Sequence, residues 1–199
     1  HISSGMVWFA ERNVNKIGRL DPSTNTFTEW TVPTNNSHPY EPVVYGGMVW
    51  FTERDGNKIC RLDPSTNTFT EWALPDASSA PQRIIVSSNG KVWFNEAPWY
   101  ITDRNRIGRL DPKTNKLTEW DVPTPVGGNS HPYTINEDAM GNIYFTEIYG
   151  NQIGKLKPKG GTDRGTLSVT QTIVTPVSST SHPTRSTVPL ATSTVTPTT

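Results

Sequence analysis

The sequence predicts an all-β fold: a β-propeller of about four four-stranded antiparallel blades, followed by a Ser/Thr/Pro-rich C-terminal tail. The first observation behind this prediction is an internal repeat, whose leading phenylalanines are Phe9, Phe51, Phe94 and Phe145. A period of roughly 40–50 residues built from short apolar runs is typical of propellers and repeat arrays. The second observation is that the runs are rich in β-branched and aromatic residues, which favour strands.

The repeat at residues 49–72 shows the elements in chain order. Residues 49–53 (Val-Trp-Phe-Thr-Glu) and 59–62 (Ile-Cys-Arg-Leu) predict two strands. Residues 63–67 (Asp-Pro-Ser-Thr-Asn) predict a turn, because Pro presets φ and Asn tolerates the left-handed conformation. Residues 69–72 (Phe-Thr-Glu-Trp) predict the returning strand.

The third observation is that the predicted sheets are apolar on both faces. In the first hairpin, a loop over residues 22–25 would place Leu20 opposite Phe27 and Ile17 opposite Trp30. Residues 17 and 20 have opposite parity, so each face of the sheet carries one large apolar pair. Blades packed around a propeller axis cover both faces, whereas a sandwich sheet with one solvated face does not.

The repeats divide the chain into predicted blades at residues 1–37, 38–79, 80–130 and 131–176, and a tail at residues 177–199. The first blade is expected to lack most of its opening strand, because residues 1–5 match only the end of such a strand. From residue 162 to residue 199, 19 of 38 residues are Ser or Thr. Such a tract is typical of an extended, O-glycosylated stalk, and a disordered linker is the alternative.

Composition excludes several classes of protein. The chain has 199 residues and a formal net charge of zero, which argues against a nucleic-acid-binding surface. No apolar run approaches the length of a membrane span. Cys60 is the only cysteine, so no internal disulfide can form. It takes the place that Gly18, Gly108 and Gly154 hold in the other repeats, so we interpret it as a small buried residue. The chain starts at His1, and we expect a processed product or a fragment.

The repeated blocks Val-Trp-Phe-Thr-Glu, Asn-Lys-Ile-Gly-Arg-Leu-Asp-Pro and Thr-Glu-Trp resemble those of the virginiamycin B lyase-like (streptogramin lyase) propellers, over about residues 1–160. The resemblance implies a seven-bladed propeller that opens a cyclic depsipeptide by Mg²⁺-assisted elimination, with a histidine base and carboxylates at one mouth. Glu147 matches a motif that carries such a carboxylate, and His131 is the candidate base. The family's histidine usually follows the proline that opens a blade, where this chain has Tyr40 and Tyr133.

Two sets of polar residues recur at fixed places in the repeats. One is a glutamate at the end of the second strand, which could ring one mouth and hold a cation or orient a substrate amine: Glu11, Glu53, Glu96 and Glu147. We favour the alternative that each pairs with a neighbouring Lys or Arg, such as Arg12 or Lys58. The other set is His38, His131 and His182, where a turn role is favoured over a metal site or base because Ala80 interrupts the series.

The third repeat carries an insertion that holds Trp99 and Tyr100. Binding residues concentrate in such loops, so these two side chains are candidate contacts for a partner, a glycan or a small ligand. The alternative is a loop folded onto its own aromatics. Asn35 lies in an Asn-Asn-Ser glycosylation sequon, which would matter if the protein is exported.

The sequence therefore predicts a secreted or cell-surface scaffold used for binding or self-assembly, without catalysis. The alternative is a fragment of a Mg²⁺-dependent, streptogramin lyase-like C–O lyase, and no cofactor other than Mg²⁺ is implied. Self-association is predicted through a spare opening segment that would pair with the first repeat beside residues 6–11, within the chain or with the next chain. This segment consists of His182, Pro183, Thr184, Arg185, Ser186, Thr187 and Val188.

Overall fold

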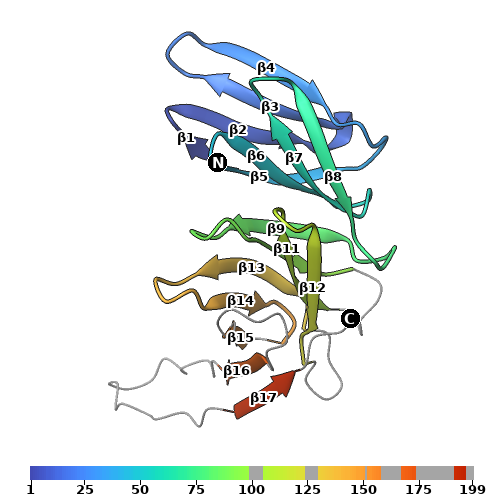
Figure 1. Ribbon diagram of the computed structural model, residues 1–199, viewed down its shortest axis with the longest axis vertical. Helices are drawn as coiled ribbons and strands as arrows, with labels where there is room; N and C mark the ends of the chain where they lie inside the picture. The colour runs from blue at the N-terminus through green and yellow to red at the C-terminus, as the bar shows by residue number, and fades with distance from the viewer. Residues whose placement is uncertain (99–104, 124–129, 151, 158–166, 174–190, 196–199) are drawn as a thin grey trace, which may run out of the picture.

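The computed structural model describes residues 1–98, 105–123, 130–150, 152–157, 167–173 and 191–195. In this part of the chain the strands form four antiparallel sheets that succeed one another along the sequence. The sheets are stacked along the long axis of the molecule, with the N-terminal sheet at one end of Figure 1 and the last sheet at the other. This arrangement confirms the predicted propeller-type, all-β fold.

The first sheet contains β1 (Ile2–Ser3), β2 (Met6–Glu11), β3 (Lys16–Asp21) and β4 (Thr26–Thr31), with a 3₁₀ turn at Arg12–Val14. The second contains β5 (Pro39–Tyr45), β6 (Met48–Glu53), β7 (Lys58–Asp63) and β8 (Thr68–Ala73). The third contains β9 (Pro81–Val86), β10 (Val92–Glu96), β11 (Arg106–Asp111) and β12 (Lys116–Asp121). The fourth contains β13 (Pro132–Glu137), β14 (Ile143–Glu147), β15 (Gln152–Leu156), β16 (Leu167–Ile173) and β17 (Ala191–Val195).

The hairpin registers agree with the repeat chemistry. Ile17 lies opposite Trp30 and Leu20 opposite Phe27, as predicted. The turn asparagines Asn25, Asn67 and Asn115 have φ near +56°, at 55°, 57° and 56°, which is the conformation that their short polar side chain tolerates. The opening strand of the first blade is reduced to β1, in which Ile2 pairs with Val7.

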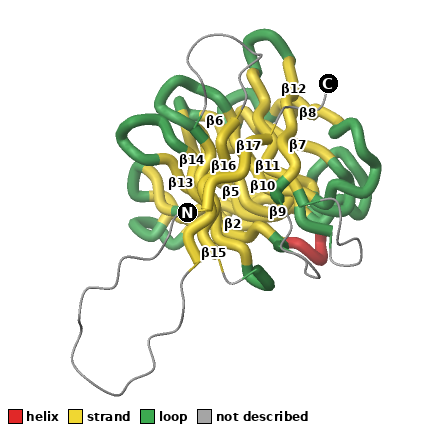
Figure 2. The backbone as a smooth tube through the Cα atoms, turned by 90° about the horizontal axis from the view of Figure 1, so that it is seen from below, coloured by secondary structure: helices red, strands yellow, loops and turns green. Residues whose placement is uncertain are grey.

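The core lies between successive blades. Strand contacts join β2 to β5, both β5 and β6 to β9, and both β9 and β10 to β13. Viewed from below in Figure 2, the strands lie over one another in the middle and the loops lie around them. Both faces of a central blade are therefore buried, which is what sheets apolar on both faces require.

Part of the C-terminal tail forms a strand in the fourth sheet. Strand β17 pairs with β16 as the fifth strand of the fourth sheet, so the described part of the tail extends its own blade. Residues 182–188, which we predicted to pair with the first repeat, lie outside the described residues. Among the described residues, no helix combines the length and apolar character needed to cross a membrane.

Candidate functional site

The recurring glutamates end the second strand of each blade and lie at the same end of all four sheets. The registers place Pro39 opposite Glu53, Pro81 opposite Glu96 and Pro132 opposite Glu147, so each glutamate faces the start of its blade's inner strand. Their exposed fractions are 0%, 0% and 2% for Glu53, Glu96 and Glu147, whereas Glu11 in the first blade is half-buried. Buried carboxylates at one end of every blade are a candidate functional site.

A second glutamate, on the outer strand, stands beside each of the first three, together with a base from the third strand. In the second blade Lys58 Nζ donates to Glu71 Oε2 at 2.6 Å. In the first blade Lys16 Nζ makes the same contact with Glu29 at 2.5 Å. Lys58, the expected partner of Glu53, lies opposite Glu53 in the hairpin, and the charge of Glu53 contributes to the raised pKa of Lys58, while its hydrogen bond goes to Glu71. The repeated Thr-Glu-Trp block contains this second acid, and in the sequence we interpreted the block only as part of the scaffold.

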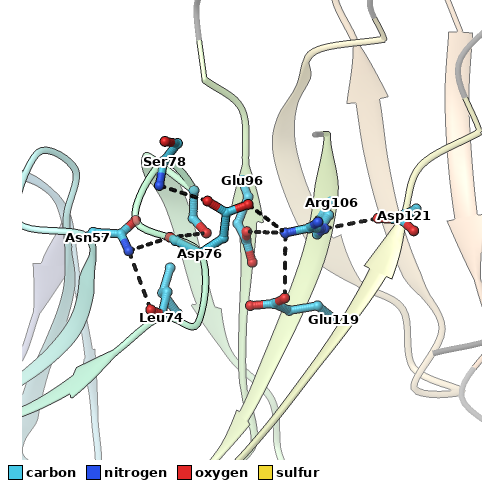
Figure 3. A network of polar contacts seen from close by, with 9 residues as sticks. Asn57, Leu74, Asp76, Ser78, Glu96, Arg106, Glu119 and Asp121 are labelled. Carbon is cyan, nitrogen blue, oxygen red and sulfur yellow. Dashed lines mark hydrogen bonds and ion pairs between the residues drawn. The ribbon is translucent and has the colours of Figure 1, made fainter. Parts of the chain in front are cut away.

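The third blade has the largest of these networks, drawn in Figure 3. The guanidinium of Arg106 lies 3.5 Å from Asp76, 3.9 Å from Glu96 and 3.7 Å from Glu119, and it also pairs with Asp121 at 2.9 Å. Asp76 belongs to the connection from the second blade, so this network joins two blades. A planar guanidinium can serve several acids at once, which a lysine ammonium does less well.

Burial dominates the titration of these groups. Burial, together with the adjacent second glutamate, raises the pKa of Glu53 to about 7 and that of Glu96 to about 8. In each pair the neighbouring carboxylate disfavours a second negative charge, so its proximity raises the pKa of the buried glutamate. The connection between the first two blades completes the cluster, because Lys58 donates to Thr34 at 2.6 Å and Thr34 donates to Glu71 at 3.0 Å. These groups stabilise blade contacts.

Of the four recurring glutamates, Glu53 alone belongs to a cluster of possible metal ligands in the described part of the chain. Among the described residues, the one group of three or more His, Cys, Asp or Glu side chains with ligand atoms within 4.8 Å of one another is Glu53, Cys60 and Glu71. Burial raises the pKa of the Cys60 thiol, so the thiol stays protonated. Mg²⁺ requires oxygen ligands in near-octahedral geometry, and here Lys58 already compensates Glu71. This cluster therefore does not fit Mg²⁺.

His131 and Glu147 are neighbours across β13 and β14. The amide of Ile148 donates to the His131 carbonyl at 3.2 Å, and the His131 ring packs on Tyr149 at 5.4 Å. His131 has no exposed surface, and its pKa is lowered by burial and by the charge of Arg54. Burial raises the pKa of Glu147 to about 7. Gly150 gives this carboxylate room, since a Cβ there would lie 2.9 Å from its Oε2.

The residue before the opening proline serves the backbone rather than chemistry. His38, Ala80 and His131 have φ of 49°, 44° and 44°, a left-handed conformation that is rare before proline. Ala80 adopts it without an imidazole, which agrees with the favoured turn role. His38 Nδ1 lies 2.6 Å from Asp55 Oδ2, so this histidine has a local acidic partner.

A groove of about 260 Å³ lies at the same end, where the first blade meets the inner strands. Arg83, which sequence reasoning did not single out, organises it. Its guanidinium lies 5.5 Å from the Tyr40 ring, donates to the Tyr133 hydroxyl at 2.7 Å and pairs with Glu41 at 2.7 Å. The guanidinium of Arg12 lies 5.9 Å from the centroid of the same Tyr40 ring. The groove is lined by Ala10, Arg12, Pro39, Tyr40, Glu41, Pro42 and Arg83.

The remaining predicted site residues lie either in an exposed connection or outside the described residues. Asn35 is exposed in the connection between β4 and β5, where a glycan would have room. Trp99 and Tyr100 lie outside the described residues, as do His182 and the segment that follows it.

Comparisons with known proteins agree with this architecture. The model of the Virginiamycin B lyase family matches residues 2–182. A streptogramin B lyase structure is similar with a TM-score of 0.69 at 29% identity, over 87% of this chain and 60% of that one. Virginiamycin B lyase from Staphylococcus aureus is similar with a TM-score of 0.68 at 31% identity, over 87% of this chain and 61% of that one. A catalytically inactive histidine-to-alanine variant of the Staphylococcus aureus enzyme, solved with quinupristin, has a TM-score of 0.68 at 30% identity. The match again covers 87% of this chain and 61% of that one.

More distant structures share the fold alone, among them a calcium-binding regucalcin from Agrobacterium tumefaciens, with a TM-score of 0.59 at 12% identity over 84% of this chain and 63% of that one. No curated protein sequence matches the chain. The chain thus spans about 60% of the length of the lyases that it resembles.

Proposed function

The chain belongs to the virginiamycin B lyase family, and we propose that within it this chain is a non-catalytic binding scaffold displayed outside the cell. The observation that carries the proposal is the burial of the two candidate catalytic groups, His131 and Glu147, which are 0% and 2% exposed. A general base must come within hydrogen-bond reach of the proton that it removes. Neither side chain offers a dissolved substrate that access.

The recurring glutamates support the same proposal. In the first three blades each recurring glutamate lies beside a second acid whose charge raises its pKa, and that second acid pairs with a base of the same blade. Repeated residues generally serve the repeat unit.

The groove beside Tyr40 is the surface that we assign to binding. A tyrosine ring with two guanidinium groups within 6 Å offers a flat apolar contact and several hydrogen-bond donors. Clefts of this composition suit a small ligand with one polar or anionic group, or a glycan.

Display outside the cell is supported by two features of the sequence. Asn35 is exposed within a sequon, so a glycosylating cell could modify it. The last 38 residues are half Ser or Thr, which is typical of stalks at a cell surface.

A second candidate function, a Mg²⁺-dependent C–O lyase, is favoured by Glu147. Its pKa of about 7 is suited to proton transfer near neutral pH, and about 30% identity links the chain to lyases.

The test is an elimination assay with quinupristin and Mg²⁺, followed by mass spectrometry of the depsipeptide, with Staphylococcus aureus virginiamycin B lyase as the positive control. We expect no Mg²⁺-dependent ring opening by the wild-type chain. Turnover that disappears in Glu147→Gln would overturn the scaffold proposal in favour of the lyase.

A further inference from the structure

One position of the repeat carries a thiol in the second blade and a glycine in the other three. Cys60 lies in β7, opposite Glu71 of β8 and opposite Phe51 of β6. Glu53 stands two residues after Phe51 in the same strand, and side chains of a strand alternate between its two faces. Three neighbouring strands therefore bring one thiol and two carboxylates to the same face of the sheet.

The other repeats show that the fold does not need this thiol. A Cβ at Gly18, Gly108 or Gly154 would lie 2.1–2.3 Å from the phenylalanine ring of the neighbouring strand, so that ring occupies the space. The pair of acids is present without a thiol as Glu11 with Glu29 and as Glu96 with Glu119. The thiol of the second blade is thus an addition to an acid pair that the repeat uses elsewhere without it.

The three groups are withdrawn from water, and one of them lacks a partner. Glu53 and Cys60 are 0% exposed, and Glu71 is half-buried. Neither carboxylate oxygen of Glu53 has a hydrogen-bond partner among the described residues. One ligand atom from each of the three side chains lies within 4.8 Å of the other two. A cation bound between them would satisfy this buried carboxylate, which is costly to leave unpaired.

The donor set selects the cation. A sulfur ligand argues against Mg²⁺ and Ca²⁺, which take oxygen ligands. Zn²⁺ binds cysteine sulfur at about 2.3 Å and carboxylate oxygen at about 2.0–2.2 Å in a tetrahedral arrangement, which places the ligand atoms about 3.5 Å from one another. The ligand atoms here already lie within 4.8 Å, and rotation of the two glutamate side chains can supply the remaining approach.

The charge of the site balances when Zn²⁺ is bound. The metal replaces the proton of the Cys60 thiol, and this proton passes to solvent. The thiolate and the two carboxylates then exceed the charge of Zn²⁺ by one. The ammonium of Lys58, 2.6 Å from Glu71 Oε2, supplies the remaining positive charge. The loaded site is therefore neutral, which avoids the cost of burying a net charge.

We propose that Glu53, Cys60 and Glu71 form a structural Zn²⁺ site where the first blade packs on the second. Cys60 belongs to the core cluster that also contains Trp8 and Trp30 of the first blade. The metal links three strands of the second blade at the face that the first blade covers. The site is separate from the candidate base and acid of the fourth blade, so the proposal holds for a scaffold and for a lyase alike.

The test is refolding of the full chain from urea in excess Zn²⁺, because the buried ligands are accessible to the metal in the unfolded chain. After gel filtration in metal-free buffer, elemental analysis should find about one zinc per chain. Cys60→Ala and Glu53→Gln should each raise the dissociation constant for Zn²⁺ by at least about 100-fold, since even the partners of metal ligands are worth about 10–100-fold. Glu119→Gln makes the matched change in the third blade, which has no thiol, and should retain the zinc.

Two further measurements distinguish this site from adventitious binding at histidines. Co²⁺ refolded into the wild-type chain should give the near-ultraviolet charge-transfer absorption of a thiolate ligand, which Cys60→Ala should lack. Zn²⁺ should raise the Tm of the wild-type chain but not that of Cys60→Ala. A wild-type chain that retains no zinc would overturn the proposal, as would zinc retained equally by Cys60→Ala or a cobalt complex without the thiolate absorption.

Discussion

Replacing Glu147 with glutamine should stabilise the protein at neutral and higher pH and leave its stability almost unchanged in mild acid. The Glu147 side chain is 2% exposed, and among the described residues neither of its carboxylate oxygens has a hydrogen-bond partner. An ionised carboxylate in such surroundings is costly. Burial accordingly raises its pKa from 4.5 to about 7, and no second acid contributes, unlike in the second and third blades.

The sign follows from proton binding. Between pH 4.5 and about 7 the native protein holds a proton on Glu147 that the unfolded chain has lost, so the free energy of unfolding falls as pH rises. Ionisation of Glu147 does not affect the free energy of unfolding below the pKa of the unfolded chain, and it destabilises the protein fully above the pKa of the native protein. The difference between the two pKa values corresponds to about 3 kcal/mol. Glutamine has the shape of the protonated acid but never ionises, so it removes this term.

The assay is urea denaturation of both proteins across this pH range. At pH 8 we expect the variant to be more stable by about 2–3 kcal/mol, and at pH 5 we expect the two to agree within about 0.5 kcal/mol. Glu137→Gln makes the same chemical change at a half-exposed position of β13 and should stay within about 0.5 kcal/mol throughout. A variant that is less stable at pH 8, or a difference that does not depend on pH, would refute the reasoning, because the native carboxylate would then be ionised and paired.

Three further predictions concern the blade contacts. Trp72→Ala should lower the free energy of unfolding by about 3 kcal/mol in denaturant titrations, because it removes a stacked indole and its bond to Asn115; a loss below about 1 kcal/mol would contradict this packing. Gly108→Ala should cost about 1–3 kcal/mol in the same titrations, since its Cβ would lie 2.2 Å from the Phe94 ring, whereas Cys60→Ala at the equivalent place should cost less than about 1.5 kcal/mol. The Cys60 thiol is buried and its pKa is raised by burial, so it should react with a disulfide reagent only after unfolding; rapid reaction in the native protein would show that the core opens.

The candidate site was predictable in its location but not in its chemistry. The period of the repeat places Glu11, Glu53, Glu96 and Glu147 at the same end of four strands, and the structure agrees. Which base meets which acid depends on the outer strand. In the second blade Glu71 reaches Lys58 and displaces the expected partner, because a hairpin register brings side chains together that are 13 residues apart.

The groove was not predictable from any local pattern. Arg83 comes from β9, Tyr40 from β5 and Tyr133 from β13, three inner strands that are far apart in the sequence. Their contact depends on how closely successive blades pack, and no single repeat contains that distance.

By itself, the sequence determined the strands, the turns, the two apolar faces of each sheet and the membership of a propeller family. These properties depend on period, side-chain parity and turn residues, all of which act over a few positions. Only the tertiary structure decided which surfaces are buried. The face that carries Phe51 is buried in the second blade, whereas the equivalent face with Phe27 is partly exposed in the first, because burial depends on whether a neighbouring blade covers the face. The tertiary structure also determines the properties of the candidate base and acid, because packing around His131 and Glu147 controls both their access to substrate and their proton affinity.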